Sequence, residues 1–96
     1  MDIIEFRALR RHVDDIGAHI SNGAYFDEKH KTAGYIYQIA EGDVLYIEEV
    51  SPHWSESARL KGKYYLLIHR EEWFSDDLEA LERRLYEYAM DEELFN

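Results

Sequence analysis

Residues 33–50 read AGYIYQIAEGDVLYIEEV, and this stretch gives the clearest indication of the fold. Two runs rich in β-branched and aromatic residues, 35–40 and 44–50, flank a Glu-Gly-Asp tripeptide in which Gly42 can adopt the positive φ of a tight turn. The pattern therefore predicts a β-hairpin. Farther along the chain, the sequence KYYLLIH predicts a third strand over residues 63–69.

An N-terminal helix is predicted before the hairpin. Asp2 and Glu5 have the spacing of a capping box. The apolar residues that follow recur every three or four positions, which is typical of an amphipathic helix; they are Ile3, Phe6, Leu9, Val13, Ile16 and Ile20. The Ser-Asn-Gly sequence at 21–23 is expected to end this helix. Residues 23–32 are interpreted as a loop with a short edge strand at 24–26.

A second helix is predicted at the C-terminus, where Ser75 is the expected N-cap and Asp76 and Asp77 lie favourably in the first turn. Its predicted buried stripe consists of Leu78, Leu81, Leu85, Tyr88 and Ala89. Glu82 lies about 40° from the centre of this stripe, on its inward shoulder. Residues 51–62 are expected to form a loop with one helical turn.

The predicted order is thus α-β-β-β-α, an α+β fold in a single compact domain of residues 1–96. Its simplest arrangement is a three-stranded antiparallel sheet covered on one face by two helices. The open edges of such a sheet, together with its uncovered face, are compatible with a homodimer.

Composition excludes several classes of protein. The chain is 46% hydrophobic, which suffices for one core. It has no cysteine, which excludes a disulfide framework and a thiolate zinc site. Neither a signal peptide nor a stretch of about 20 apolar residues is recognisable, so a cytoplasmic protein is expected. There is no glycine-rich phosphate loop, zinc-binding helix motif or nucleophile elbow, so no cofactor, metal or catalytic residue is predicted from motifs.

The charge of the chain is strongly negative and unevenly distributed. The net charge is −10, and residues 71–96 carry ten acids and two bases against eleven acids and nine bases in residues 1–70. Such a distribution disfavours direct binding to nucleic acid or to an anionic membrane. It favours a basic protein surface as the partner.

The predicted partner-binding residues are acids of the C-terminal segment and tyrosines of the hairpin. Residues 76–93 span about 27 Å as a helix, whereas a duplex of that length carries about sixteen charges. The helix, with eight acids and two arginines, can therefore contact several basic groups but cannot imitate a continuous duplex. A solvated face and tyrosines that only pack are the alternatives. The candidates are Glu71, Glu72, Asp76, Asp77, Glu79, Glu87, Asp91, Glu92, Glu93, Tyr35, Tyr37 and Tyr46.

The sequences YIYQI at 35–39 and LYIEE at 45–49 resemble the paired signature of GIY-YIG nucleases. The resemblance implies that Tyr37 and Tyr46 match the motif tyrosines, Arg59 the motif arginine and Glu82 the carboxylate that binds a divalent metal. Both motif glycines are absent, since Tyr35 and Glu48 occupy their positions.

The profile of the whole chain is similar to that of small acidic phage inhibitors of the anti-CRISPR and anti-restriction groups. This resemblance implies a non-enzymatic inhibitor that blocks a basic nucleic-acid-binding surface of a partner complex. Two alternatives stay open: a degenerate GIY-YIG-like metal-dependent nuclease, and an immunity or antitoxin protein that neutralises a basic toxin.

Overall fold

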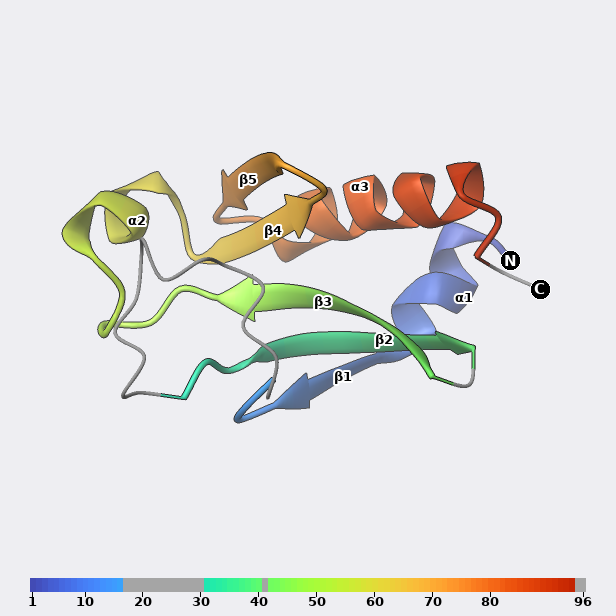
Figure 1. Cartoon of the computed structure of the whole chain (residues 1–96), viewed down its shortest axis with the longest axis horizontal. Coiled ribbons are helices and arrows are strands. Elements are labelled where there is room, and N and C mark those ends of the chain that lie inside the picture. The colour runs from blue at the N-terminus through green and yellow to red at the C-terminus, as the bar shows by residue number, and fades with distance from the viewer. Residues whose placement is uncertain (17–30, 41, 95–96) are drawn as a thin grey trace.

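The computed structural model describes residues 1–16, 31–40 and 42–94 (Figure 1). The chain forms an α+β domain with a five-stranded antiparallel sheet, so the predicted class is confirmed. The predicted α-β-β-β-α layout with three strands is wrong in detail. The elements are α1 (Ile3–Ala8), β1 (Arg10–Val13), β2 (Gly34–Ala40), β3 (Asp43–Glu49), α2 (Glu56–Lys61), β4 (Tyr64–Ile68), β5 (Glu71–Ser75) and α3 (Leu78–Asp91). The strands lie side by side in chain order, from β1 to β5.

The N-terminal helix is much shorter than its periodicity predicts. Asp2 and Glu5 do form a capping box, but α1 ends at Ala8, and residues 10–13 form strand β1 on the edge of β2. The ladder with β2 supplies backbone hydrogen bonds and cross-strand contacts that override the local helical pattern. The remainder of the predicted helix, its stop at 21–23 and the predicted strand at 24–26 fall mostly outside the described residues.

The central hairpin is confirmed. β2 and β3 pair as predicted, and Gly42 in the turn adopts a φ of 85°. In the register Tyr35 faces Ile47, and Tyr37 faces Leu45. Because residues directly opposite each other in a ladder share a face, these four side chains project to the same side of the sheet.

Strand β5 is a second strand that the sequence did not predict. It begins with Glu71 and Glu72, whose exposed side chains are tolerated because β5 is an edge strand. The cap of α3 is also different from the prediction. Asp77 is the N-cap and accepts a hydrogen bond from the Glu79 N–H, whereas the Ser75 hydroxyl accepts one from the Asp77 N–H.

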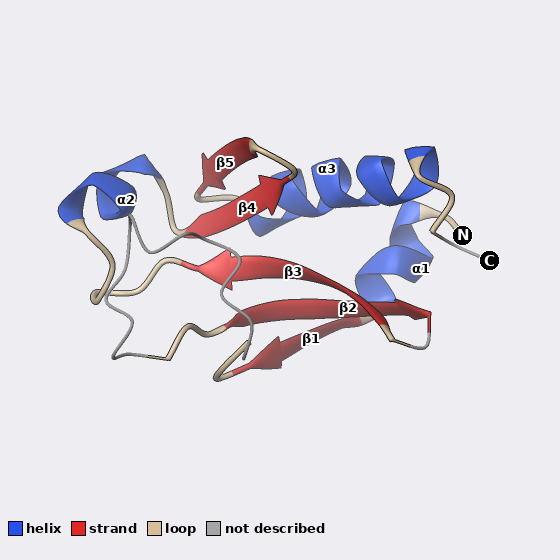
Figure 2. Ribbon diagram, in the orientation of Figure 1, coloured by secondary structure: helices blue, strands red, loops and turns tan. Residues whose placement is uncertain are grey.

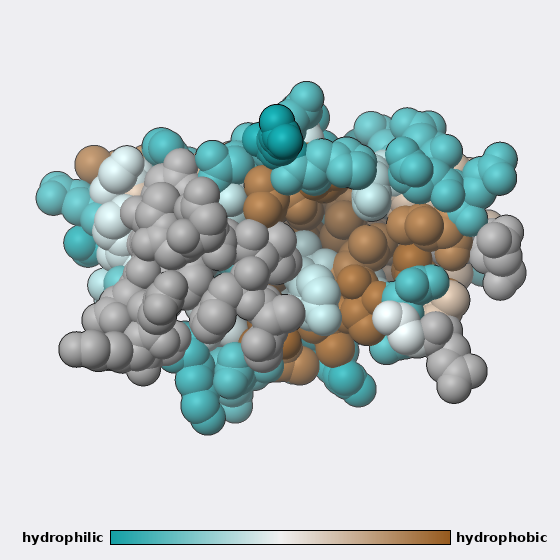
Figure 3. Space-filling view, in the orientation of Figure 1, coloured by the Kyte–Doolittle hydropathy of each residue, from teal (hydrophilic) through white to brown (hydrophobic). Residues whose placement is uncertain are grey.

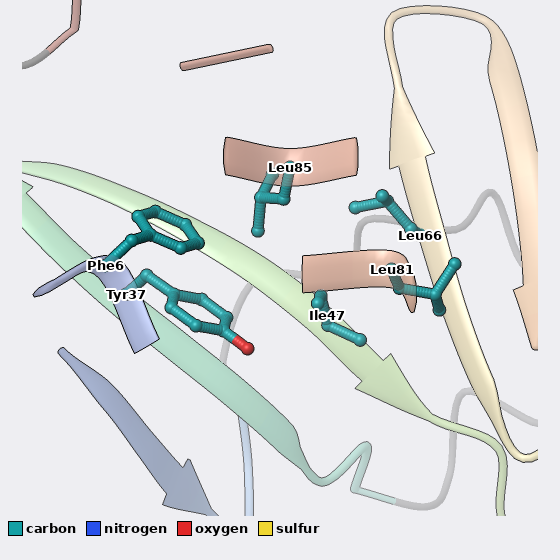
Figure 4. Packing of buried hydrophobic residues seen from close by; sticks show 6 residues of the cluster. All are labelled: Phe6, Tyr37, Ile47, Leu66, Leu81 and Leu85. Carbon is teal, nitrogen blue, oxygen red and sulfur yellow. The ribbon is translucent and has the colours of Figure 1, made fainter. Parts of the chain in front are cut away.

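The helices lie on both faces of the sheet (Figure 2). α1 and α3 cover the face that carries Tyr37, and the principal core lies between them and the sheet (Figure 4), formed by Phe6, Tyr37, Ile47, Leu66, Leu81 and Leu85. The buried stripe of α3 is thereby confirmed. α2 packs on the opposite face, where Ala58 joins Trp54 and Tyr65 in a second cluster. None of the helices in the described ranges is long and apolar enough to cross a membrane.

The sheet divides between β3 and β4. Two ladder pairs join these strands, Glu48 with Tyr65 and Glu49 with Tyr64. Beyond them, β3 and β4 diverge toward opposite sides of the molecule (Figure 1). The rest of β3, residues 43–47, therefore makes no ladder pair with β4, although it remains paired with β2 on its other side.

We predict that Gly34→Ala destabilises the fold by about 1–3 kcal/mol, the usual cost of overpacking. Gly34 is buried between β1 and β3, and an added Cβ would overlap the Ile47 backbone oxygen and lie 2.6 Å from Ile16 Cδ1. Thermal unfolding measures the change. Gly42→Asn is the matched control, because the space around Gly42 is open and Asn tolerates positive φ. Equal stabilities of the two variants would contradict this account.

Candidate functional site

Glu82 lies at the centre of a buried polar network. Its side chain projects from α3 into the core and has no exposed surface. The Tyr37 hydroxyl donates a hydrogen bond of 2.7 Å to Glu82 Oε2. Arg10 Nη1 donates to the same oxygen at 3.3 Å. The network therefore joins β1, β2 and α3, which are far apart in the sequence.

Arg7 completes the network from α1. Its Nε lies 3.5 Å from Glu82 Oε1, and its side chain is 28% exposed. Both atoms are buried, and neither has a hydrogen-bond partner within the described part of the chain. Glu82 Oε1 is therefore held by attraction to the positive charge of Arg7 and not by a well-formed hydrogen bond. Phe6, next to Arg7, stacks on the Tyr37 ring with centroids 4.8 Å apart.

The environment of Tyr37 fixes its protonation. Burial raises the pKa of Tyr37 far above its ordinary value, and the hydrogen bond to Glu82 and the charge of that carboxylate raise it further. Arg10 acts in the opposite direction but more weakly. The phenol therefore stays protonated at any neutral or mildly alkaline pH and serves as a permanent donor to the carboxylate.

The network has the character of an interior ion pair. A divalent cation would have to displace two guanidinium groups from a carboxylate that has no solvent access. The four residues selected by the GIY-YIG resemblance are also only partly brought together. Tyr37 and Glu82 are in contact. Arg59, on α2, instead donates a hydrogen bond to the Trp54 carbonyl oxygen. Tyr46 projects to the face of the sheet opposite Tyr37. Within the described ranges, no three His, Asp or Glu side chains converge on a possible metal position.

The nine predicted acidic contact residues are all exposed, but several already have structural roles. Asp77 caps α3, and Asp76 Oδ1 accepts from the Lys63 N–H at 3.1 Å. Glu72 accepts a 2.5 Å hydrogen bond from the Tyr65 hydroxyl, and Glu79 lies 3.8 Å from Arg7. These four carboxylates help to hold the β5–α3 region in place.

Of the other five acids, Glu71 lies on β5 and four lie toward the C-terminal end of α3. These four are Glu87, Asp91, Glu92 and Glu93, and no basic residue lies in the last turn. A Schellman motif ends the helix, with Leu94 N–H donating to the Ala89 carbonyl and Glu93 N–H to that of Met90. Glu93 occupies the left-handed position of this motif, with φ 53°, where glycine is usual.

Arginines interrupt the acidic surface. Arg7, Arg83 and Arg84 line a surface groove of about 550 Å³ together with Asp77, Glu79, Ala80 and Glu87. The Arg84 guanidinium also lies over the Trp73 ring at 5.1 Å. The expected acidic strip along α3 is therefore interrupted by a mixed groove that extends from Asp77 to Glu87, where the C-terminal acids begin.

The predicted tyrosines do not share one surface. Tyr37 is fully buried, which corrects its assignment as a contact residue. Tyr35 is half-buried on the same face, with its ring 5.1 Å from that of His12. Burial and the neighbouring Tyr64 raise the pKa of Tyr35. Tyr46 is half-buried on the opposite face, so the tyrosines and the acids do not combine as expected.

Sequence reasoning missed the two arginines of the network. The predicted helix over residues 3–20 placed Arg7 on an exposed face, and nothing in its pattern directed Arg10 toward Glu82. The strand β1 changes this, because Arg10 pairs with Tyr37 in the ladder and so projects to the same side. Comparison of the chain with protein-family models, with curated proteins and with solved structures finds no match.

We predict that Glu82→Ala lowers the free energy of unfolding by about 3 kcal/mol, because breaking a buried ion pair leaves its partners uncompensated. Glu82→Gln is expected to cost less, since the amide oxygen can still accept from Tyr37. Glu87→Ala on the exposed side of α3 is the matched control and should change stability by under about 0.5 kcal/mol. Urea unfolding measures all three, and equal effects of Glu82→Ala and Glu87→Ala would contradict the role of the network.

The raised pKa of Tyr37 also predicts a loss of stability at alkaline pH. Above about pH 10 the unfolded chain releases this proton and the folded chain does not, so stability falls as pH rises. Below the unfolded pKa the effect is absent. One such residue contributes up to about 1.4 kcal/mol per pH unit. Urea unfolding between pH 9 and 11 should show a shallower decline for Tyr37→Phe than for the wild type, and identical slopes would refute this assignment.

Proposed function

We propose that the chain is a non-enzymatic acidic binding protein that occupies a basic, nucleic-acid-binding surface of a partner complex. The observation that carries the proposal is the acidic patch at the C-terminal end of α3, defined here as Glu87, Asp91, Glu92 and Glu93. The partner class matches the anti-CRISPR and anti-restriction inhibitors whose profile the chain resembles.

Folding energetics do not account for this patch. The helix dipole places partial negative charge at the C-terminus, so Asp91, Glu92 and Glu93 are each unfavourable there by about 0.3–1 kcal/mol. A non-glycine residue in the left-handed conformation of Glu93 adds about 1–2 kcal/mol. Bases at these positions and a glycine at 93 would stabilise the domain. A surface that opposes stability in this way is typical of a binding site.

Electrostatics favour a basic protein partner. A net charge of −10 on 96 residues steers the chain toward positive surfaces and away from phosphate. Association with a basic groove should be fast and should weaken as ionic strength rises. The patch carries only a few charges, so it would compete for a few phosphate-binding contacts and would not fill a long duplex channel.

The alternatives differ in how well the geometry supports them. An immunity or antitoxin protein would use the same acidic patch, so the partner's identity separates it from an inhibitor. The metal-dependent nuclease requires an open carboxylate at Glu82, and the enclosure of Glu82 by Tyr37 and two arginines gives that reading no support.

The test combines stability and binding in one variant. We predict that Asp91→Lys with Glu92→Lys raises the melting temperature by several degrees, because the helix dipole is then complemented. The same variant should lose at least tenfold in affinity for the partner. Partners are isolated from host lysate at low salt, eluted at high salt and purified. Their binding to labelled nucleic acid is then measured while increasing amounts of the wild-type or variant acidic chain are added as a competitor.

The matched control is Asp14→Lys with Glu56→Lys, which changes the net charge equally at exposed positions outside the patch. It should retain most of the competition with nucleic acid. Full competition by the stabilised Asp91→Lys, Glu92→Lys variant would overturn the proposal. An equal loss in both variants would assign the effect to net charge alone and would also overturn the patch.

A further inference from the structure

The gap between β3 and β4 is an apolar slot that is open on one side. It has a volume of about 150 Å³. Figure 3 shows hydrophobic side chains gathered over this region. Side chains of β3 and β4 form its walls and side chains of α3 form its floor, the principal residues being Val44, Tyr46, Leu67, Ile68, Leu85 and Tyr88. Most of these side chains are half-buried, and Leu85 is fully buried.

The backbone beside the slot is as important as its side chains. After two ladder pairs at Glu48 and Glu49, the strands separate, so residues 43–47 of β3 and 66–68 of β4 do not pair with each other. A β-strand directs alternate N–H and C=O groups to each side, and those on the β4 side of β3 border the slot. Such an edge is a template for an added strand.

The slot is large enough for one apolar side chain of a bound segment. A cavity of about 150 Å³ lined by aliphatic and aromatic residues is large enough for a benzene-sized group. His69 closes one end, because it adopts a φ of 57° in the β4–β5 turn and its ring lies 5.5 Å from that of Tyr88. The slot is therefore suited to a single phenylalanine- or leucine-sized anchor from a bound segment.

The rim indicates the charge of the flanking residues. Asp43 is exposed where β3 begins, directly before Val44 of the slot. A second hollow of about 240 Å³ shares Leu67 and His69 with the slot and is also lined by Arg70 and Glu72. Basic residues on either side of the anchor would meet this mostly acidic rim.

We propose that the slot binds an extended segment of a partner polypeptide, which pairs with the free edge of β3 and inserts one large apolar side chain between basic neighbours. This is strand addition, in which backbone hydrogen bonds supply affinity and a pocket supplies specificity. The inference uses a different surface from the acidic patch of α3 and does not depend on it.

The test uses a synthetic peptide, acetyl-Lys-Val-Lys-Phe-Lys-Val-Lys-amide, titrated into isotope-labelled protein and followed by amide chemical shifts. We expect saturable shifts concentrated at residues 43–47 and 66–68. Val44→Trp fills the slot while keeping a strand-favouring residue, and it should weaken binding at least tenfold. Ile4→Trp adds the same side chain at an exposed position of α1 outside the slot and is the matched control, and thermal unfolding confirms that both variants fold.

Two modified peptides separate strand addition from simple attraction. Replacement of the central Phe by Ala, or N-methylation of that Phe, should each weaken binding at least tenfold, because the first removes the anchor and the second removes a backbone donor. The Asp91→Lys, Glu92→Lys variant should bind the peptide as well as the equally charged Asp14→Lys, Glu56→Lys variant does, so failure of the acidic-patch proposal leaves this one intact.

Several outcomes would overturn the inference. These are shifts spread over all acidic residues, equal binding of the N-methylated peptide, or unchanged binding by Val44→Trp. Concentration-dependent shifts at residues 43–47 without peptide would assign the slot to a second copy of the chain, and would equally overturn it.

Discussion

The buried carboxylate of Glu82 is the constraint on which the arrangement of the other elements depends. A carboxylate without solvent access needs hydrogen-bond donors or positive charge around it, and here α1 supplies a charge while β1 and β2 supply donors. Meeting this requirement fixes the end of α1 against α3 and orients the first strand so that Arg10 projects inward. The Phe6–Tyr37 stack and the leucines of α3 then pack around a polar centre that permits little change in geometry.

The acids of this chain belong to two groups with different energetics. Asp76, Asp77 and Glu72 accept hydrogen bonds that hold β5 and the beginning of α3 in place. The acids at the other end of α3 oppose the helix dipole instead. A count of charges in the sequence treats the two groups alike. Only their position in the structure separates the acids that hold β5 and α3 in place from those that oppose the helix dipole.

The parts of the fold that were predictable are those specified by local chemistry. The hairpin with Gly42, the capping box at Asp2 and the inward position of Glu82 all follow from propensity or period. Strand β1 was not predictable, because its spacing of apolar residues continues that of α1 and only the ladder with β2 makes it a strand. β5 begins with two glutamates that hide its alternation. The site was half predictable for the same reason: Tyr37 and Glu82 could be identified, but Arg7 and Arg10 depend on the true end of α1.

The chain-order arrangement of the strands has a consequence for how the domain folds. Every strand pairs with its neighbour in the sequence, so each ladder can form without a crossover connection, and the β2–β3 and β4–β5 hairpins need only short turns. The Arg10–Glu82 contact is of another kind, because it spans 72 residues. Closing that distance is entropically costly until the meander is in place. We therefore expect the Glu82 carboxylate to lose its water late in folding, after the transition state. Removal of the Arg10–Glu82 contact should then mainly accelerate unfolding.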